Sequence, residues 1–148
     1  MIDPKSLSNW TPYALAVLRI VAGLIFLEHG TQKLLGFPSG ERAFVDAMTL
    51  SWWAGVFELI LGALITLGLF TRVAAFIAAG EMAFAYWIAH APQNFFPVNN
   101  GGDAAILYCF VFLFLVFAGP GRWSIDAWHQ AEDLGTPPVT ERKRYSAP

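Results

Sequence analysis

Ionisable and amide side chains interrupt a stretch that is otherwise apolar enough to cross a membrane. The stretch covers residues 13–35, and its polar members are Arg19, Glu28, His29, Gln32 and Lys33. A charged side chain near the bilayer centre costs about 2.5–3.5 kcal/mol on insertion scales, so it normally faces a partner or a wet cavity. Acids, imidazoles and amides in such a place can pass protons and hydrogen-bond a polar molecule. We therefore expect a polar site inside a membrane-embedded helical bundle.

Two further carboxyls, Glu58 and Glu81, lie in later apolar stretches, each on a helix face shared with glycines or alanines that permit close helix contact. At about 1.5 Å of rise per residue, Glu28, Glu58 and Glu81 all lie roughly 10–14 Å below the outward ends of their helices. We expect these three carboxyls to converge in one layer, in the outward half of the membrane, together with His29 or Lys33.

Each polar residue also has a purely structural interpretation. Glu58 and Glu81 could be hydrogen-bonded across helices, and His29 could be a packing residue. Arg19 is expected to be an anchor whose long stem snorkels to the cytoplasmic interface. No pair of His or Cys residues has a spacing that predicts a metal or haem site, so no metal is expected. Cys109 is the only cysteine, which excludes a disulfide within one chain.

Composition and hydropathy indicate which elements must position these residues. Of 148 residues, 56% are hydrophobic and 14% are charged, against about 25% charged in ordinary soluble domains. Four apolar stretches approach the roughly 20 residues that a transmembrane helix needs; they cover residues 13–35, 51–70, 73–91 and 103–118. We predict an all-α fold, a transmembrane four-helix bundle with a short interfacial C-terminal segment at residues 123–128. A soluble helical bundle is disfavoured, because these helices lack polar faces.

The distribution of Lys and Arg predicts the orientation. Most of them fall on the side of the membrane that holds both termini, so both termini are expected in the cytoplasm of a multi-pass protein of the inner (plasma) membrane. Residues 1–134 are expected to form a single membrane domain, and residues 135–148 a disordered tail. The lipid bilayer is the expected partner. The net charge of −2 and the absence of a basic stripe disfavour binding to nucleic acid.

Several motifs in their order along the chain resemble those of the DoxX family of small four-helix membrane proteins. They are RIVAGLIFLEHGTQK at residues 19–33, Glu58 with Gly62, GLFTR at residues 68–72, NGG at residues 100–102 and GPGRWSID at residues 119–126. The resemblance covers about residues 13–128. The family is named for a membrane subunit of a thiosulfate-to-quinone oxidoreductase, also described as a terminal quinol oxidase subunit.

This resemblance implies that the protein is a component of a quinone-linked oxidoreductase. Glu28 and His29 are then the candidate catalytic residues. Gln32, Lys33, Glu58 and Glu81 are the candidate ligand-binding residues. A quinone or quinol is the expected ligand, without a tightly bound cofactor, and a redox protein or further copies of the chain are the expected protein partners. The alternative is a non-enzymatic protein that binds a lipid or small metabolite or assists the assembly of another membrane protein. A transporter is the third option, disfavoured by the small size of one chain.

Overall fold

A computed structural model of the chain describes residues 4–40 and 43–133, and the described part contains helices and no strands. The helices are α1 (Pro4–Ser8), α2 (Thr11–Leu35), α3 (Leu50–Leu67), α4 (Thr71–Ala85), the π-helical turn η1 (Tyr86–His90), α5 (Pro97–Asn100), α6 (Asp103–Ala118) and α7 (Ile125–Asp133). The four predicted spans agree with α2, α3, α4 with η1, and α6 to within three residues at each end. The predicted disordered tail lies outside the described residues.

Three of these helices are long and apolar enough to cross a membrane. They comprise residues 6–35, 50–67 and 71–90, whereas α6 has 16 residues and is shorter. At about 1.5 Å per residue, α6 covers about 24 Å, which is shorter than the roughly 30 Å thickness of the hydrocarbon core. The all-helical membrane character of the fold is therefore confirmed, and a fourth complete span stays a prediction.

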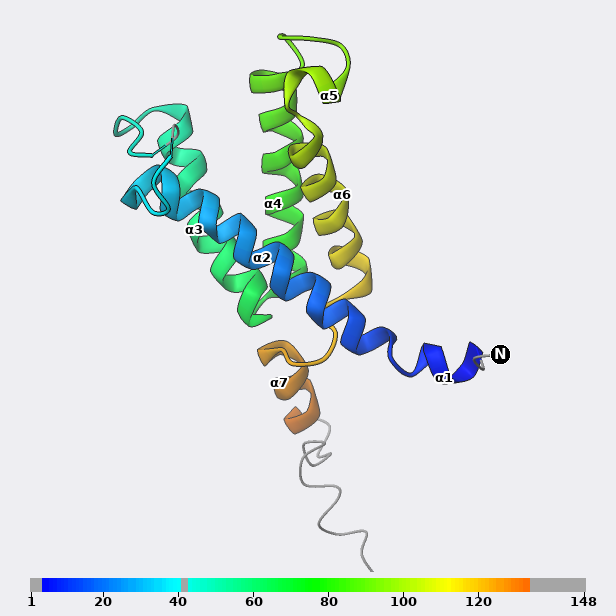
Figure 1. The fold of residues 1–148 in the computed structure, drawn as a ribbon. Coiled ribbons are helices and arrows are strands. Elements are labelled where there is room, and N and C mark those ends of the chain that lie inside the picture. The colour runs from blue at the N-terminus through cyan, green and yellow to red at the C-terminus, as the bar shows by residue number, and fades with distance from the viewer. Residues whose placement is uncertain (1–3, 41–42, 134–148) are drawn as a thin grey trace, which may run out of the picture.

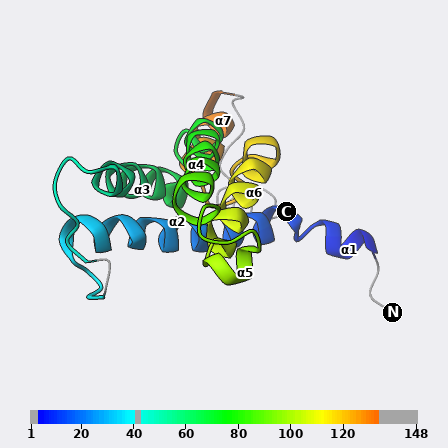
Figure 2. The same ribbon diagram turned by 90° about the horizontal axis from the view of Figure 1, so that it is seen from above.

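The long helices form two pairs rather than an evenly packed bundle. Helices α2 and α3 lie side by side, α4 packs against α6, and α3 joins the two pairs through its shorter contact with α4 (Figures 1 and 2). Glycines bring α2 and α3 close together, because a Cβ atom added to Gly30 would lie 2.8 Å from the Gly55 carbonyl oxygen. One added to Gly62 would lie 2.6 Å from the Leu27 nitrogen. Between the pairs, the rings of Phe26 and Phe112 meet edge to face, with centroids 4.9 Å apart.

The two pairs are held together at one end of the molecule, which we call the base and which comprises residues 11–19, 65–72 and 116–126. Arg19 of α2 is completely buried there. Its guanidinium donates hydrogen bonds of 2.6–2.8 Å to the carbonyl oxygens of Ile65, Thr66, Pro120 and Trp123. The expectation that Arg19 snorkels to the interface is therefore wrong. Its charge satisfies carbonyls in the segment after α6 and at the end of α3, where the Ile65 carbonyl also accepts a hydrogen bond from the Gly68 nitrogen.

Two further charged residues bind helix ends at the base. The Asp126 carboxylate accepts hydrogen bonds of 2.8 Å from the backbone nitrogens of Phe70 and Thr71, where α4 begins. The Arg72 guanidinium donates to the carbonyl oxygens of Val116 and Phe117, where α6 ends. Both charges have the sign that the helix dipole favours at that end. The motifs at residues 68–72 and 119–126 thus fix the base. They also bring the N-terminal end of α2 close to the start of α7, since the Arg122 nitrogen donates to the Pro12 carbonyl oxygen.

Candidate functional site

A cavity of about 690 Å³ lies between the two helix pairs. Its apolar wall includes Trp53, Phe57, Ile77, Phe84 and Ile88, and these side chains are between 42 and 58% exposed. The polar side chains that line it are His29, Lys33, Ser51, Glu58, Glu81, His90, Gln93 and Tyr108. An open, apolar cavity with a few polar groups is typical of a site for a small organic molecule.

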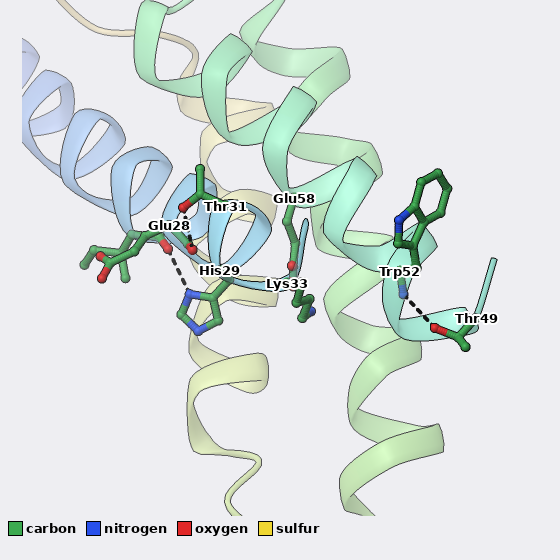
Figure 3. A network of polar contacts seen from close by, with 8 residues as sticks. Glu28, His29, Thr31, Lys33, Thr49, Trp52 and Glu58 are labelled. Carbon is green, nitrogen blue, oxygen red and sulfur yellow. Dashed lines mark hydrogen bonds and ion pairs between the residues drawn. The ribbon is translucent and has the colours of Figure 1, made fainter. Parts of the chain in front are cut away.

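Lys33 and Glu58 form an ion pair across the close contact between α2 and α3. The Lys33 Nζ lies 2.6 Å from the Glu58 Oε1 (Figure 3). The Glu58 side chain is 3% exposed and the Lys33 side chain 15%. The small residues on these helices allow the backbones to approach, so that the two chains can meet in the interior. The pair gives each buried charge the partner that it needs.

Glu81 of α4 faces the cavity from the opposite helix pair. Both of its carboxyl oxygens are buried, and neither has a hydrogen-bond partner among the described residues. The carboxyl lies within electrostatic range of Glu58 and Lys33. Leaving a buried polar group without a hydrogen bond is costly. A proton on the carboxyl, together with a polar group of a bound molecule or water, would satisfy it.

His29 is held at the edge of the cavity by its own helix and by α6. Its Nδ1 lies 2.9 Å from the Ile25 carbonyl oxygen, which can only accept, so Nδ1 carries a hydrogen and the neutral ring has Nε2 as an acceptor. The ring meets Tyr108 edge to face at 6.0 Å between centroids. His29 is therefore oriented before any ligand binds, and its Nε2 has no hydrogen-bond partner within the part of the chain that the structure describes.

Glu28 and Gln32 lie outside this cavity. Figure 3 shows the exposed Glu28 side chain pointing away from Lys33 and Glu58. Together with Gln32, it lines a separate depression of about 150 Å³. The Gln32 Nε2 donates to the Pro38 carbonyl oxygen at 3.3 Å, which helps to fix the loop after α2. The expected convergence of three carboxyls therefore holds for Glu58 and Glu81 but is wrong for Glu28.

Several residues of the cavity, His90 and Tyr108 among them, were not expected from the sequence. His90 lines it from η1, where its Nδ1 lies 2.9 Å from the Asn100 carbonyl oxygen, and Tyr108 lines it from α6. Tyr108 lies one helical turn from Phe112, so the sequence could place these two side chains on one face of the same helix. Its contact with His29 could not be predicted, because that requires knowing that α2 approaches α6. Among the described residues, no group of three or more His, Cys, Asp or Glu could hold a metal ion.

The arrangement can hold a polar head group and move protons. Glu81 can donate or accept a hydrogen bond according to its protonation, and the neutral His29 ring can accept one at Nε2. The Lys33–Glu58 ion pair, which carries no net charge, lines the same cavity. Around them the aromatic and aliphatic wall suits an apolar ring or chain.

Comparisons with known proteins place the chain among membrane proteins. The model of the DoxX family matches residues 14–91. An uncharacterized protein of Haemophilus influenzae is 46% identical over 129 residues, covering 82% of this chain and 95% of that protein. An uncharacterized membrane protein of Mycobacterium tuberculosis is 30% identical over 139 residues, covering 83% of this chain and 85% of that protein. No solved structure matches the chain.

Proposed function

This chain belongs to the DoxX family of integral membrane proteins, and we propose that it binds a lipid-soluble quinone between its helix pairs as a component of a quinone-linked oxidoreductase. The observation that carries the proposal is the Glu81 carboxyl, buried and without a hydrogen-bond partner at the wall of an open apolar cavity. A quinone matches that environment, since its ring and tail are apolar and its two oxygens are hydrogen-bond acceptors.

The residues present fit a quinone head group. The cavity volume of about 690 Å³ falls in the range of about 300–1,000 Å³ that is usual for small-molecule sites. Glu81 on α4 and His29 on α2 line it from different helix pairs. Trp53, Phe57 and Phe84 offer flat apolar surfaces, and their exposure leaves room for a tail to reach the bilayer.

The chain's own residues would bind the head group and handle protons. The bound quinone would supply the redox chemistry, since its reduction to a quinol consumes two electrons and two protons. A protonated Glu81 can donate to a quinone oxygen, and the neutral His29 Nε2 can accept from a quinol hydroxyl. The Lys33 ammonium would attract, and the Glu58 carboxylate would repel, the carboxylate that forms when Glu81 loses its proton.

Electrons must reach this site from another molecule. The lone Cys109 cannot form a dithiol pair within one chain, and no described residue set provides a metal centre. We propose that a redox protein docked on this chain, or a diffusible reductant, is the electron donor. In that arrangement the chain supplies the quinone site and its proton groups.

Binding of a quinone with a short alkyl tail to the purified protein tests the proposal. Trp53 lines the cavity, so binding should quench tryptophan fluorescence in a saturable manner. Replacing His29 by Ala should abolish this quenching or weaken the affinity by about tenfold, because one specific hydrogen bond is lost while little packing is removed. Leu64→Ala is the matched control, since Leu64 packs against the core and does not line the cavity.

The control variant should keep its quinone affinity although it is less stable. If His29→Ala binds the quinone as the unchanged protein does, or unfolds as readily as Leu64→Ala, the ligand role of His29 is wrong.

The open apolar wall along α3 and α4 also suits a membrane lipid, which makes lipid binding without catalysis the second candidate. Saturable quenching by phospholipid, with no saturable quenching by quinone, would favour that candidate.

A further inference from the structure

The cavity reaches the end of the molecule opposite the base. On α3 it extends from Glu58 to Leu50, the first residue of that helix. On α4 and beyond, it extends from Ile77 past Glu81 to Gln93, which follows η1. We call this end, formed among the described residues by 35–40, 43–50 and 91–103, the open end. Figure 1 shows it at the top, where the loops before α3 and around α5 lie far from α7.

Between the cavity and the base the interior is closed. Leu61 and Ile65 lie on the base side of Glu58 along α3, and Ala74, Ala75 and Ala78 lie on the base side of Glu81 along α4. All five are at most 4% exposed and belong to one hydrophobic cluster with Phe112 and Leu115. Below this cluster, the buried Arg19 guanidinium donates hydrogen bonds to backbone carbonyls. A close-packed apolar layer of this kind leaves no room for a file of water molecules.

We propose that the cavity is a half-channel, through which Glu81 exchanges protons only with the aqueous phase at the open end. The exchange is the ionisation of the carboxyl to a carboxylate, with the proton passing to water in the cavity. The charged and titratable groups around Glu81 come from every helix that lines the cavity: Lys33 and His29 of α2, Glu58 of α3, His90 of η1 and Tyr108 of α6. Ser51 and Gln93 continue the polar lining toward the open end.

A half-channel of this kind fixes the side of the membrane with which the site exchanges protons. Any proton that a bound molecule gives up at Glu81 leaves on the open-end side, and any proton that it takes up comes from there. If the termini are cytoplasmic, as the Lys and Arg distribution predicts, that side is the outside of the cell membrane. The inference holds for any ligand that exchanges protons at Glu81, so it does not depend on the ligand being a quinone.

Cysteine accessibility tests the half-channel in oriented membrane vesicles. Cys109 is first replaced by Ala, and single cysteines are then introduced at Ala54 and Ala85, which line the cavity. Ala85 lies one helical turn from Glu81 toward the open end. Ser39→Cys marks the open end and Gln130→Cys marks the side of the base, since both residues are exposed. Ala78→Cys, in the closed layer, is the internal control.

A charged methanethiosulfonate reagent that cannot cross the membrane is applied from each side. The cysteines at positions 54 and 85 should be labelled completely from the side that labels position 39, and not at all from the side that labels position 130. Position 78 should stay unlabelled from both sides. Labelling of the cavity positions from the base side or from both sides, or failure to label either one, overturns the half-channel. The two cavity variants change residues on different helices. If one of them does not fold, the other still tests the proposal.

Discussion

At the scale of single residues, the site consists of one ion pair and one carboxyl that belongs to no ion pair among the described residues. Lys33 and Glu58 neutralise each other at 2.6 Å, whereas Glu81 has no hydrogen-bond partner among the described residues. These two states suggest a division of roles. The pair holds α2 against α3 and sets the local charge, and Glu81 remains available to a ligand or a proton.

The ion pair predicts a strong dependence of stability on Lys33. Replacing Lys33 by Met leaves the Glu58 carboxylate buried without its cation, which should lower the free energy of unfolding by about 3 kcal/mol. Adding Glu58→Leu to that variant should recover much of the loss, since two apolar side chains can replace a buried pair. Unfolding of the purified single and double variants in detergent measures both effects. A double variant no more stable than Lys33→Met alone would show that the pair does not hold the helices together.

At the scale of elements, glycines decide which helices pair closely. A Cβ atom added to Gly30 would lie 2.5 Å from the Leu59 nitrogen, so α2 and α3 would have to move apart. Gly80 lies in the middle of α4, and a Cβ atom there would meet nothing within 4 Å. Replacing glycine by alanine at these two positions therefore distinguishes the effect of helix packing on stability from the effect of helix propensity.

We expect Gly30→Ala to lower the free energy of unfolding by about 1–3 kcal/mol, because the added methyl group overpacks a backbone contact. Gly80→Ala should be neutral or should stabilise the protein by up to about 1 kcal/mol, since alanine favours a helix more than glycine does. Thermal unfolding of both variants in the same detergent checks the pair. Equal destabilisation of the two variants would mean that α2 and α3 do not pack as closely as described.

The sequence predicted the helices well because their signals are local. Apolar stretches set their lengths, and residues such as Gly36 and Gly68, both left-handed at the helix ends, set their limits. The partners of Arg19 could not be predicted in this way. They lie 46 to 104 positions away along the chain, and a local pattern shows only a charge near a helix end.

The candidate site was predicted in part for a similar reason. The rise per residue gives the depth of a side chain but not the face of the helix on which it lies. The depth of Glu28 matched that of Glu58, yet its helical phase sets it away from the line of Gly23, Gly30 and Lys33, which packs against α3. That phase was the signal that Glu28 lies outside the cavity. The separation of the helices into two pairs, which creates the cavity, depends on tertiary packing.

At the scale of the whole molecule, a base fixed by charged residues contrasts with an open end that contains the cavity. Arg19, Arg72 and Asp126 bind the ends of helices α3, α6 and α4 at the base. The helix pairs can therefore diverge toward the other end without coming apart. This shape leaves the cavity that these polar groups line open to a molecule that arrives from the bilayer or from the open end.

The central claim is that a lipid-soluble quinone occupies this cavity. The most direct test is purification of the protein from its native membrane in mild detergent, followed by mass spectrometry of the small molecules that it retains. Glu81→Leu, purified in the same way, is the matched control, because it keeps the apolar wall and removes the unsatisfied carboxyl. We predict that the unchanged protein retains a quinone and that the variant loses it. Retention of no quinone, of equal amounts by both proteins, or of phospholipid alone would contradict the account.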